Sequence, residues 1–121
     1  MINEFFLSDE SYENMSITGR LLSDLTSYRA NSIFYDRVID ILVVRYPDYD
    51  NRSEEVKSQI DEMLHGRTAA CDGFYYLSRF FEVSYGKITD EVMDGITETA
   101  TELAEHALKA YGWIKEKEGV M

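Results

Sequence analysis

Several residue types that would narrow the fold or the function are scarce in this chain. It has one cysteine, Cys71, so no disulfide can form within it, which is typical of a protein from a reducing, intracellular compartment. The chain has one proline and 7 scattered glycines, and it contains no recognisable linker, low-complexity segment or internal repeat. We therefore expect a single domain that spans residues 1–121.

Long hydrophobic segments are also missing. The first seven residues, Met1 to Leu7, carry no basic group, and their apolar run is too short for a secretory signal. No run approaches the roughly 18 apolar residues that a membrane-spanning helix needs. These absences predict a soluble, cytoplasmic protein that does not enter a membrane.

Basic residues are outnumbered in this sequence. There are 12 Lys and Arg against 23 Asp and Glu, for a formal net charge of −11. Such a charge repels polyanions, so direct binding to nucleic acid or to an anionic membrane is disfavoured. It attracts basic protein surfaces and divalent cations. The simpler interpretation is that the charge only keeps a small protein in solution.

Apolar residues recur with the helical period through most of the chain, and no hairpin signal interrupts them. This pattern predicts an all-α fold. The expected helices are joined by short connections. They span residues 8–29, 31–46, 52–65, 69–85 and 88–115.

Caps and helix breakers set these boundaries. Five N-cap positions are expected, at Ser8, at Asn31 or Ser32, at Asn51 (in a capping box with Glu54), at Thr68 and at Thr89. Pro47 ends the second helix, and Gly66 and Gly86 each follow a helix end. Gly19 should weaken the middle of the first helix, and Gly112 can end the last one early.

The segment 31–46 has a second interpretation. Residues 38–44 are rich in β-branched side chains and could form a buried strand. A buried strand would have to hide Asp40, whereas a helix exposes it. We therefore prefer the helix.

The segment 69–85 is apolar nearly all round, so we expect it to be the central helix. Its inward residues should be Ala70, Cys71, Phe74, Leu77, Phe80 and Phe81. The last segment is long and amphipathic, and the tail at 116–121 should fray. Its apolar stripe consists of Ile88, Val92, Ile96, Leu103, Ala107, Ala110 and Ile114. The predicted fold is thus a single-domain bundle of about five helices, with an aromatic-rich central helix and a long amphipathic C-terminal helix.

Catalytic motifs find little support. Cys71 lies on the predicted buried side of an aromatic helix, where a free cysteine usually acts as a small hydrophobic residue. Glu62 and His65 form one Glu-x-x-His step, but di-metal bundles use that step twice, with two further glutamates. No glycine-rich phosphate loop is present. We predict no catalytic residue, no metal ligand and no cofactor, and an enzyme is the less favoured class.

The enzymatic alternative is an Mg²⁺-dependent all-α nucleotide pyrophosphatase of the MazG type. Those enzymes hold Mg²⁺ with Glu-x-x-Glu and Glu-x-x-Asp steps on adjacent helices. The step Glu91-Val-Met-Asp94 is similar to one of them. The other candidate steps, 10–13 and 102–105, depart from the family: one is far upstream and the other is on the same helix.

A second alternative is a helical bundle that binds a small ligand. Nine tyrosines and four arginines could line a site for an anionic or aromatic molecule between helices. The arginines are Arg29, Arg45, Arg67 and Arg79. Tyrosines at the edge of a core, with solvated hydroxyls, explain the same composition without a ligand.

The last segment carries a row of acidic residues three or four positions apart. Its members are Glu91, Asp94, Glu98, Glu102 and Glu105. Each neighbouring pair of like charges costs roughly 0.2–0.5 kcal/mol. The helix dipole accounts for acids in the first turn only, which leaves Glu98, Glu102 and Glu105 without that explanation. A solvated face of a very acidic helix remains the simpler interpretation.

We name these five residues the acidic row and predict that they contact a protein partner. Steps of three and four residues are about 4.5 and 6 Å along a helix, comparable with the spacing of phosphates on a nucleic-acid strand. The predicted function is a non-enzymatic inhibitor that engages a basic, nucleic-acid-binding surface, such as a nucleic-acid mimic or an immunity or antitoxin-like protein. The likeness to such inhibitors is one of charge and size only, and a homo-oligomer is left open.

Overall fold

The computed structural model describes residues 16–115, which form three long helices and one short 3-10 helix. In chain order these are α2 (Ile17–Arg45), η2 (Tyr49–Asn51), α3 (Glu54–Tyr85) and α4 (Asp90–Ala110). Between residues 16 and 115 there is no strand, so the all-α class is confirmed. The count of about five helices is wrong, because two pairs of predicted segments are each one continuous helix.

The first pair is joined in α2, which runs through the break expected near residue 30. Ser32 does not cap a new helix there, because its Oγ donates a hydrogen bond to the carbonyl of Arg29 at 2.9 Å. Ala30, Asn31 and Ser32 are all buried. These small and polar residues are of types that often begin a helix. Here they lie in the middle of α2, where neighbouring helices pack against them.

The two ends of α2 agree only partly with the prediction. The helix begins after Ser16, whose Oγ accepts from the N–H of Gly19 at 3.1 Å, so Gly19 lies in the first turn rather than in the middle. The expected cap at Ser8 lies outside the described residues. At the other end, Tyr46 donates to the carbonyl of Leu42, and Pro47 prevents continuation, as predicted. Helix, not strand, is confirmed for the described 31–46 segment, and Asp40 is exposed.

The second pair is joined in α3, which passes through Gly66 and Thr68 without a break. The helix begins at Ser53, whose Oγ accepts from the N–H of Val56 at 3.2 Å, and not at Asn51. Asn51 belongs to η2, where its side chain donates to Asp48. Gly66 does not end the helix. It lies within α3, beneath an aromatic ring of α2.

Two glycines of α3 allow this close approach. A Cβ atom at Gly66 would lie 2.7 Å from Cζ of Tyr35, and one at Gly73 would lie 2.7 Å from Cδ1 of Tyr28. The two glycines and the two tyrosines are each seven residues apart, which is two helical turns. The antiparallel helices α2 and α3 therefore bring one ring onto each glycine in the same register.

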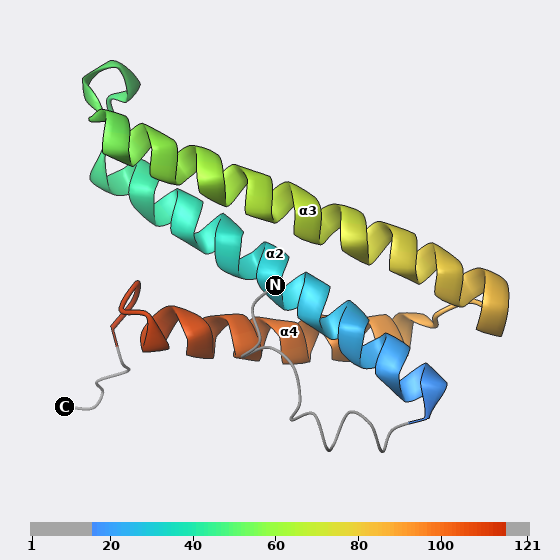
Figure 1. Ribbon diagram of the computed structural model, residues 1–121. Coiled ribbons are helices and arrows are strands. Elements are labelled where there is room, and N and C mark those ends of the chain that lie inside the picture. The colour runs from blue at the N-terminus through green and yellow to red at the C-terminus, as the bar shows by residue number, and fades with distance from the viewer. Residues whose placement is uncertain (1–15, 116–121) are drawn as a thin grey trace.

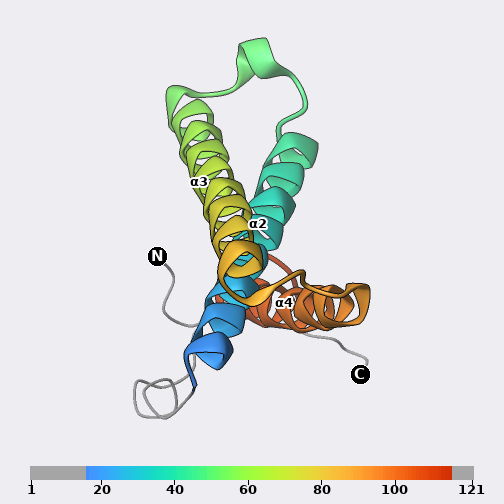
Figure 2. The ribbon, with the colours of Figure 1, turned by 90° about the vertical axis from the view of Figure 1, so that its right-hand side faces the viewer.

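The central helix is α2, and not residues 69–85 as predicted. Extensive contacts join α2 to α3 and α2 to α4, and Figure 1 shows α2 between the other two helices. Figure 2 shows α4 lying across the α2–α3 pair. Because α3 makes extensive contacts with α2 alone among the described helices, much of its apolar surface stays uncovered by them. Cys71 and Phe80, expected to point inward, are exposed, whereas Ala70 is buried and Phe74, Leu77 and Phe81 are partly buried.

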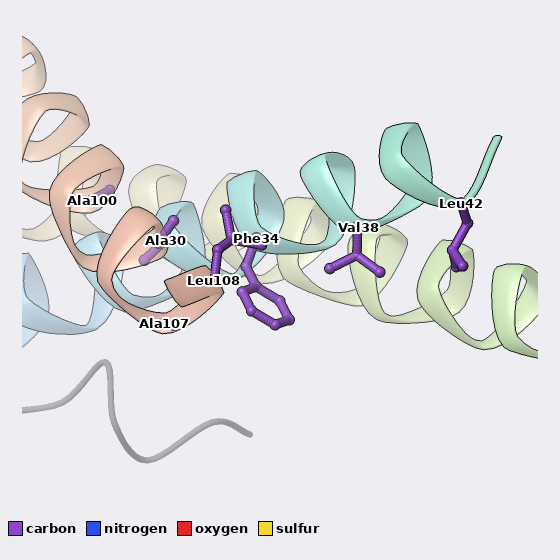
Figure 3. Packing of buried hydrophobic residues seen from close by; sticks show 8 residues of the cluster. Ala30, Phe34, Val38, Leu42, Ala100, Ala107 and Leu108 are labelled. Carbon is purple, nitrogen blue, oxygen red and sulfur yellow. The ribbon is translucent and has the colours of Figure 1, made fainter. Parts of the chain in front are cut away.

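The buried residues form two clusters along α2. The larger joins Ala30, Phe34, Val38 and Leu42 of α2 to four residues of α4, namely Ala100, Ala104, Ala107 and Leu108 (Figure 3). The smaller joins Leu25 to Ile88 and Ile96, with Phe74, Leu77 and Phe81 of α3 packed against it. An exposed ion pair also links α2 to α3: Arg67 Nη1 donates to Asp36 Oδ1 at 3.0 Å, and this hydrogen bond and charge raise the pKa of the guanidinium.

The buried face of α4 is rotated from the predicted stripe. Val92 is 40% exposed and Ala110 is exposed, whereas Ala100, Ala104 and Leu108, which the stripe omitted, are completely buried. Alanines form the centre of this face because their small side chains let α4 approach α2 closely. Of the predicted stripe, Ile88, Ile96 and Ala107 are buried as expected, and Leu103 and Ile114 are partly buried.

Both ends of α4 are well defined. Thr89 caps the start as predicted, with its Oγ1 accepting from the N–H of Val92 at 3.2 Å, and Gly86 closes α3 with a φ of 101°. At the far end, Trp113 donates to the carbonyl of Leu108 and Gly112 to that of Lys109, with Gly112 at a φ of 80°. This is the Schellman arrangement. The helix therefore stops at Ala110 rather than at 115.

A glycine series tests the contact between α2 and α3. Gly95→Ala on α4 should raise the free energy of unfolding by up to about 1 kcal/mol, because alanine favours the helix and a Cβ there meets nothing within 4 Å. Gly73→Ala gains the same preference but must displace the ring of Tyr28, which typically costs about 1–3 kcal/mol. We expect a net loss of about 1 kcal/mol, measured by urea denaturation.

The same series contains its control. In a Tyr28→Ala background the ring is gone, so Gly73→Ala should become stabilising, like Gly95→Ala. Equal stabilisation by Gly73→Ala and Gly95→Ala in the otherwise natural chain would mean that Tyr28 does not lie over Gly73.

Candidate functional site

The acidic row lies on the surface of α4. All five of its carboxylate residues are exposed. At about 100° per residue, they centre nearly opposite the buried face made by Ile96, Ala100, Ala104, Ala107 and Leu108. The rotation of the buried face places the row more directly away from α2 than the predicted stripe did. The row is thus presented outward by a helix that is fixed on its other side.

The charges of the acidic row are not balanced locally. Within residues 16–115, none of the five carboxylates forms an ion pair, in contrast to Glu54, which pairs with Lys57, and Asp36, which pairs with Arg67. The segment 90–110 holds six Asp and Glu and one Lys, which is a net charge of −5 with His106 neutral. From Glu91 to Glu105 the row extends about 21 Å at 1.5 Å per residue.

One exposed aromatic residue lies at the end of α4. Tyr111 is 58% exposed, and its ring makes an edge contact with Phe34, with the centroids 5.9 Å apart. The contact with a buried residue orients the ring beside the last turn of the helix. The other exposed tyrosines in the described part of the chain lie at the end of α2, on η2 and on α3; they are Tyr46, Tyr49, Tyr75, Tyr76 and Tyr85. At about 100° per residue, Tyr111 lies on the side of the buried face of α4 and not on the side of the acidic row.

The arginines and tyrosines suggested for a ligand site are not gathered in one place. Arg45 lies over the ring of Trp113 at 5.8 Å, Arg79 lies over Tyr75 at 5.9 Å, and Arg67 pairs with Asp36. Two tyrosines of α2, Tyr28 and Tyr35, do line a cavity between α2 and α3, but none of its lining residues is an arginine.

Side chains that could bind a metal do not converge in the described part of the chain. Across residues 16–115, no group of three or more His, Cys, Asp or Glu is close enough to hold an ion. Glu62 and His65 are exposed on α3, and Glu91 and Asp94 are exposed on α4. The candidate acids at 10–13 lie outside the described residues. The pyrophosphatase alternative gains no observation from this region. In the same range, no helix is long and apolar enough to span a membrane.

Two features of the structure were not foreseen in the sequence. The first is an exposed apolar strip on the second half of α3, formed by Tyr76, Phe80 and Val83. Their spacing of four and three residues places them on one face of a helix. The sequence pattern could have shown this face as distinct from the one that begins at Ala70. The second is Asn31, a buried polar residue in the middle of α2. It was interpreted as a helix cap, so its burial was missed.

Comparison with known proteins gives no further guide. The chain matches no family model, no curated protein and no solved structure. Its own side chains are therefore the basis for a function. Among them, the acidic row combines exposure, a rigid support and a large local charge.

Proposed function

We propose that this protein is a non-enzymatic binding module that engages a basic surface of a partner protein through the acidic row of α4. The more specific form of the proposal is an inhibitor, a nucleic-acid mimic or an immunity or antitoxin-like protein, that occupies a nucleic-acid-binding surface. One observation carries it: five exposed carboxylates follow one another along α4, and none forms an ion pair within residues 16–115.

The energetic argument concerns the repulsion within the row. Four neighbouring pairs of like charge each cost roughly 0.2–0.5 kcal/mol in the free protein. The dipole of α4 offsets this for Glu91 in the first turn, but not for the acids farther along. A basic partner converts the same charges from mutual repulsion into attraction, and it accelerates association by electrostatic steering.

The geometry of the row suits an elongated basic surface. Because α4 is one uninterrupted helix from Asp90 to Ala110, the carboxylates keep a nearly straight course. Their spacing of about 4.5 to 6 Å along the axis is comparable with that of phosphates along a nucleic-acid strand. A groove lined with Lys and Arg to bind a phosphate backbone would find charges of the same sign at similar intervals.

The test is charge reversal in the middle of the row. Glu98→Lys with Glu102→Lys should weaken binding of the protein's partner, captured from its native cells, by roughly 30-fold, because two attractive contacts become repulsive. Affinity of the unaltered chain should also fall steeply between low and high salt, since exposed charges are screened. Both effects can be measured by surface plasmon resonance with the purified partner.

The matched control reverses two exposed acids on another helix. Asp61→Lys with Glu62→Lys on α3 gives the same change in net charge, from −11 to −7, because each substitution removes one negative charge and adds one positive charge. This variant should bind nearly as well as the unaltered chain. If the two double variants bind equally, net charge rather than the acidic row explains the attraction. A partner retained at high salt by the α4 variant would show that the row is only a solvated face.

A further inference from the structure

A cavity lies between α2 and α3, away from the acidic row. Its volume is about 200 Å³. Three of its lining residues come from α2 and three from α3, the two helices that run side by side in Figure 1. They are Tyr28, Asn31 and Tyr35, and Gly66, Ala69 and Ala70.

The small residues of α3 explain why space remains there. Tyr28 and Tyr35 lie over Gly73 and Gly66, where a Cβ atom would collide with their rings. Between these two contacts α3 presents only Ala69 and Ala70, whose methyl groups cannot fill the space that the rings hold open. The cavity therefore has an aromatic ring at each end and a floor of alanine and glycine.

Asn31 contributes a buried side-chain amide to the lining of this cavity. It is 5% exposed, and its buried Oδ1 accepts no hydrogen bond from any group within residues 16–115. An unpaired buried carbonyl is unfavourable, because it has lost its bonds to water without gaining others. Leucine at this position would fill space without that penalty. The lining contains no charged side chain, so it does not favour an ion.

We propose that this cavity binds a small, uncharged, single-ring molecule that carries one O–H or N–H donor. The donor pairs with Asn31 Oδ1, and the ring lies between Tyr28 and Tyr35 over the alanine floor. The size is suitable, because a cavity of about 150 Å³ holds benzene, and about 200 Å³ leaves room for a small substituent. Apolar walls with one or two well-placed polar groups are the usual composition of small-molecule sites.

Phenol and toluene test the proposal on the full chain. They have nearly the same shape, but only phenol has a donor. Phenol should bind saturably and at least about tenfold more tightly than toluene, since toluene leaves Asn31 unpaired. Titration followed by ¹H–¹⁵N NMR should shift the side-chain amide of Asn31 with phenol. Equal affinities, or no saturable binding of phenol, would overturn the proposal and leave a hydrated or merely structural cavity.

Three variants distinguish the effect of the hydrogen bond to Asn31 from the effect of the cavity volume. Asn31→Leu should remove the preference for phenol over toluene, and Ala69→Leu should weaken both compounds at least tenfold by filling the floor. Asn51→Leu, at an exposed asparagine of η2, should leave both affinities unchanged. Circular dichroism establishes that each variant is folded. Phenol preference that survives Asn31→Leu contradicts the assignment of the acceptor. None of these results depends on the acidic row, so the two proposals fail independently.

Discussion

Phe34→Ala should lower the free energy of unfolding by about 3–5 kcal/mol, the usual cost of removing a buried phenylalanine. Phe34 is 5% exposed and is the only aromatic residue among the eight buried members of the larger cluster (Figure 3). Its ring makes edge contacts with Tyr35 at 5.6 Å and with Tyr111 at 5.9 Å. Truncation leaves a hole where α2 meets α4, and the neighbouring alanines are too short to fill it.

The matched control is Phe80→Ala, which removes the same atoms from an exposed position. Phe80 is 54% exposed on α3, so its loss should change the free energy of unfolding by less than about 1 kcal/mol. Urea denaturation followed by circular dichroism measures both variants. Domains of this size are typically stable by about 5–15 kcal/mol, so Phe34→Ala should remove a large fraction of the stability at 25 °C. Similar losses in the two variants would mean that Phe34 does not occupy the core.

The helical class and several helix ends could be predicted because their causes are local. Thr89 caps α4, Gly86 closes α3 and Pro47 prevents α2 from continuing, and each acts through its own backbone or through groups three or four residues away. The choice of helix over strand for 31–46 was also local in origin, since a buried strand had to hide Asp40. Predictions of this kind need no knowledge of what packs against the segment.

Predictions failed where a residue had both a local role and a tertiary one. Gly66 suits a helix end, but in the structure it gives space to Tyr35 of another helix, and α3 continues through it. Asn31 and Ser32 suit N-caps, but both are buried inside α2. Glycine and short polar residues are ambiguous in this way, because their small size serves close packing as well as termination. Only the partner helix decides between the two roles.

The buried face of the last segment was predicted only in part, for a related reason: Ile88, Ile96 and Ala107 are buried as expected, but the centre of the face was missed. Alanine ranks low among hydrophobic residues, so the larger side chains of the last segment attracted the prediction. Ala100 and Ala104 are completely buried because α4 lies close to α2, while Val92 remains exposed. The exposure of the acidic row was predictable, since burying unpaired carboxylates is very costly. Its proposed partner was not visible in either sequence or structure, and the cavity at Asn31 depends on two helices whose register was unknown.

Ala104→Leu provides the complementary test by adding volume instead of removing it. Ala104 is 0% exposed and faces α2 in the larger cluster. Leucine and alanine both favour the helix, so the change acts mainly through packing. Overpacking of an enclosed site typically costs about 1–3 kcal/mol, and we expect the upper end here, because the backbones of α2 and α4 are held close by alanines on both sides.

Hydrogen exchange can locate this effect as well as measure it. Because α4 makes its extensive contacts with α2, Ala104→Leu should lower protection along α4 more than along α3. Ala110→Leu is the control: it makes the same chemical change at an exposed position in the last turn, and it should alter stability by no more than about 0.5 kcal/mol. If Ala104→Leu is equally well tolerated, the alanines do not face α2, and the acidic row loses the rigid support on which its proposed function depends.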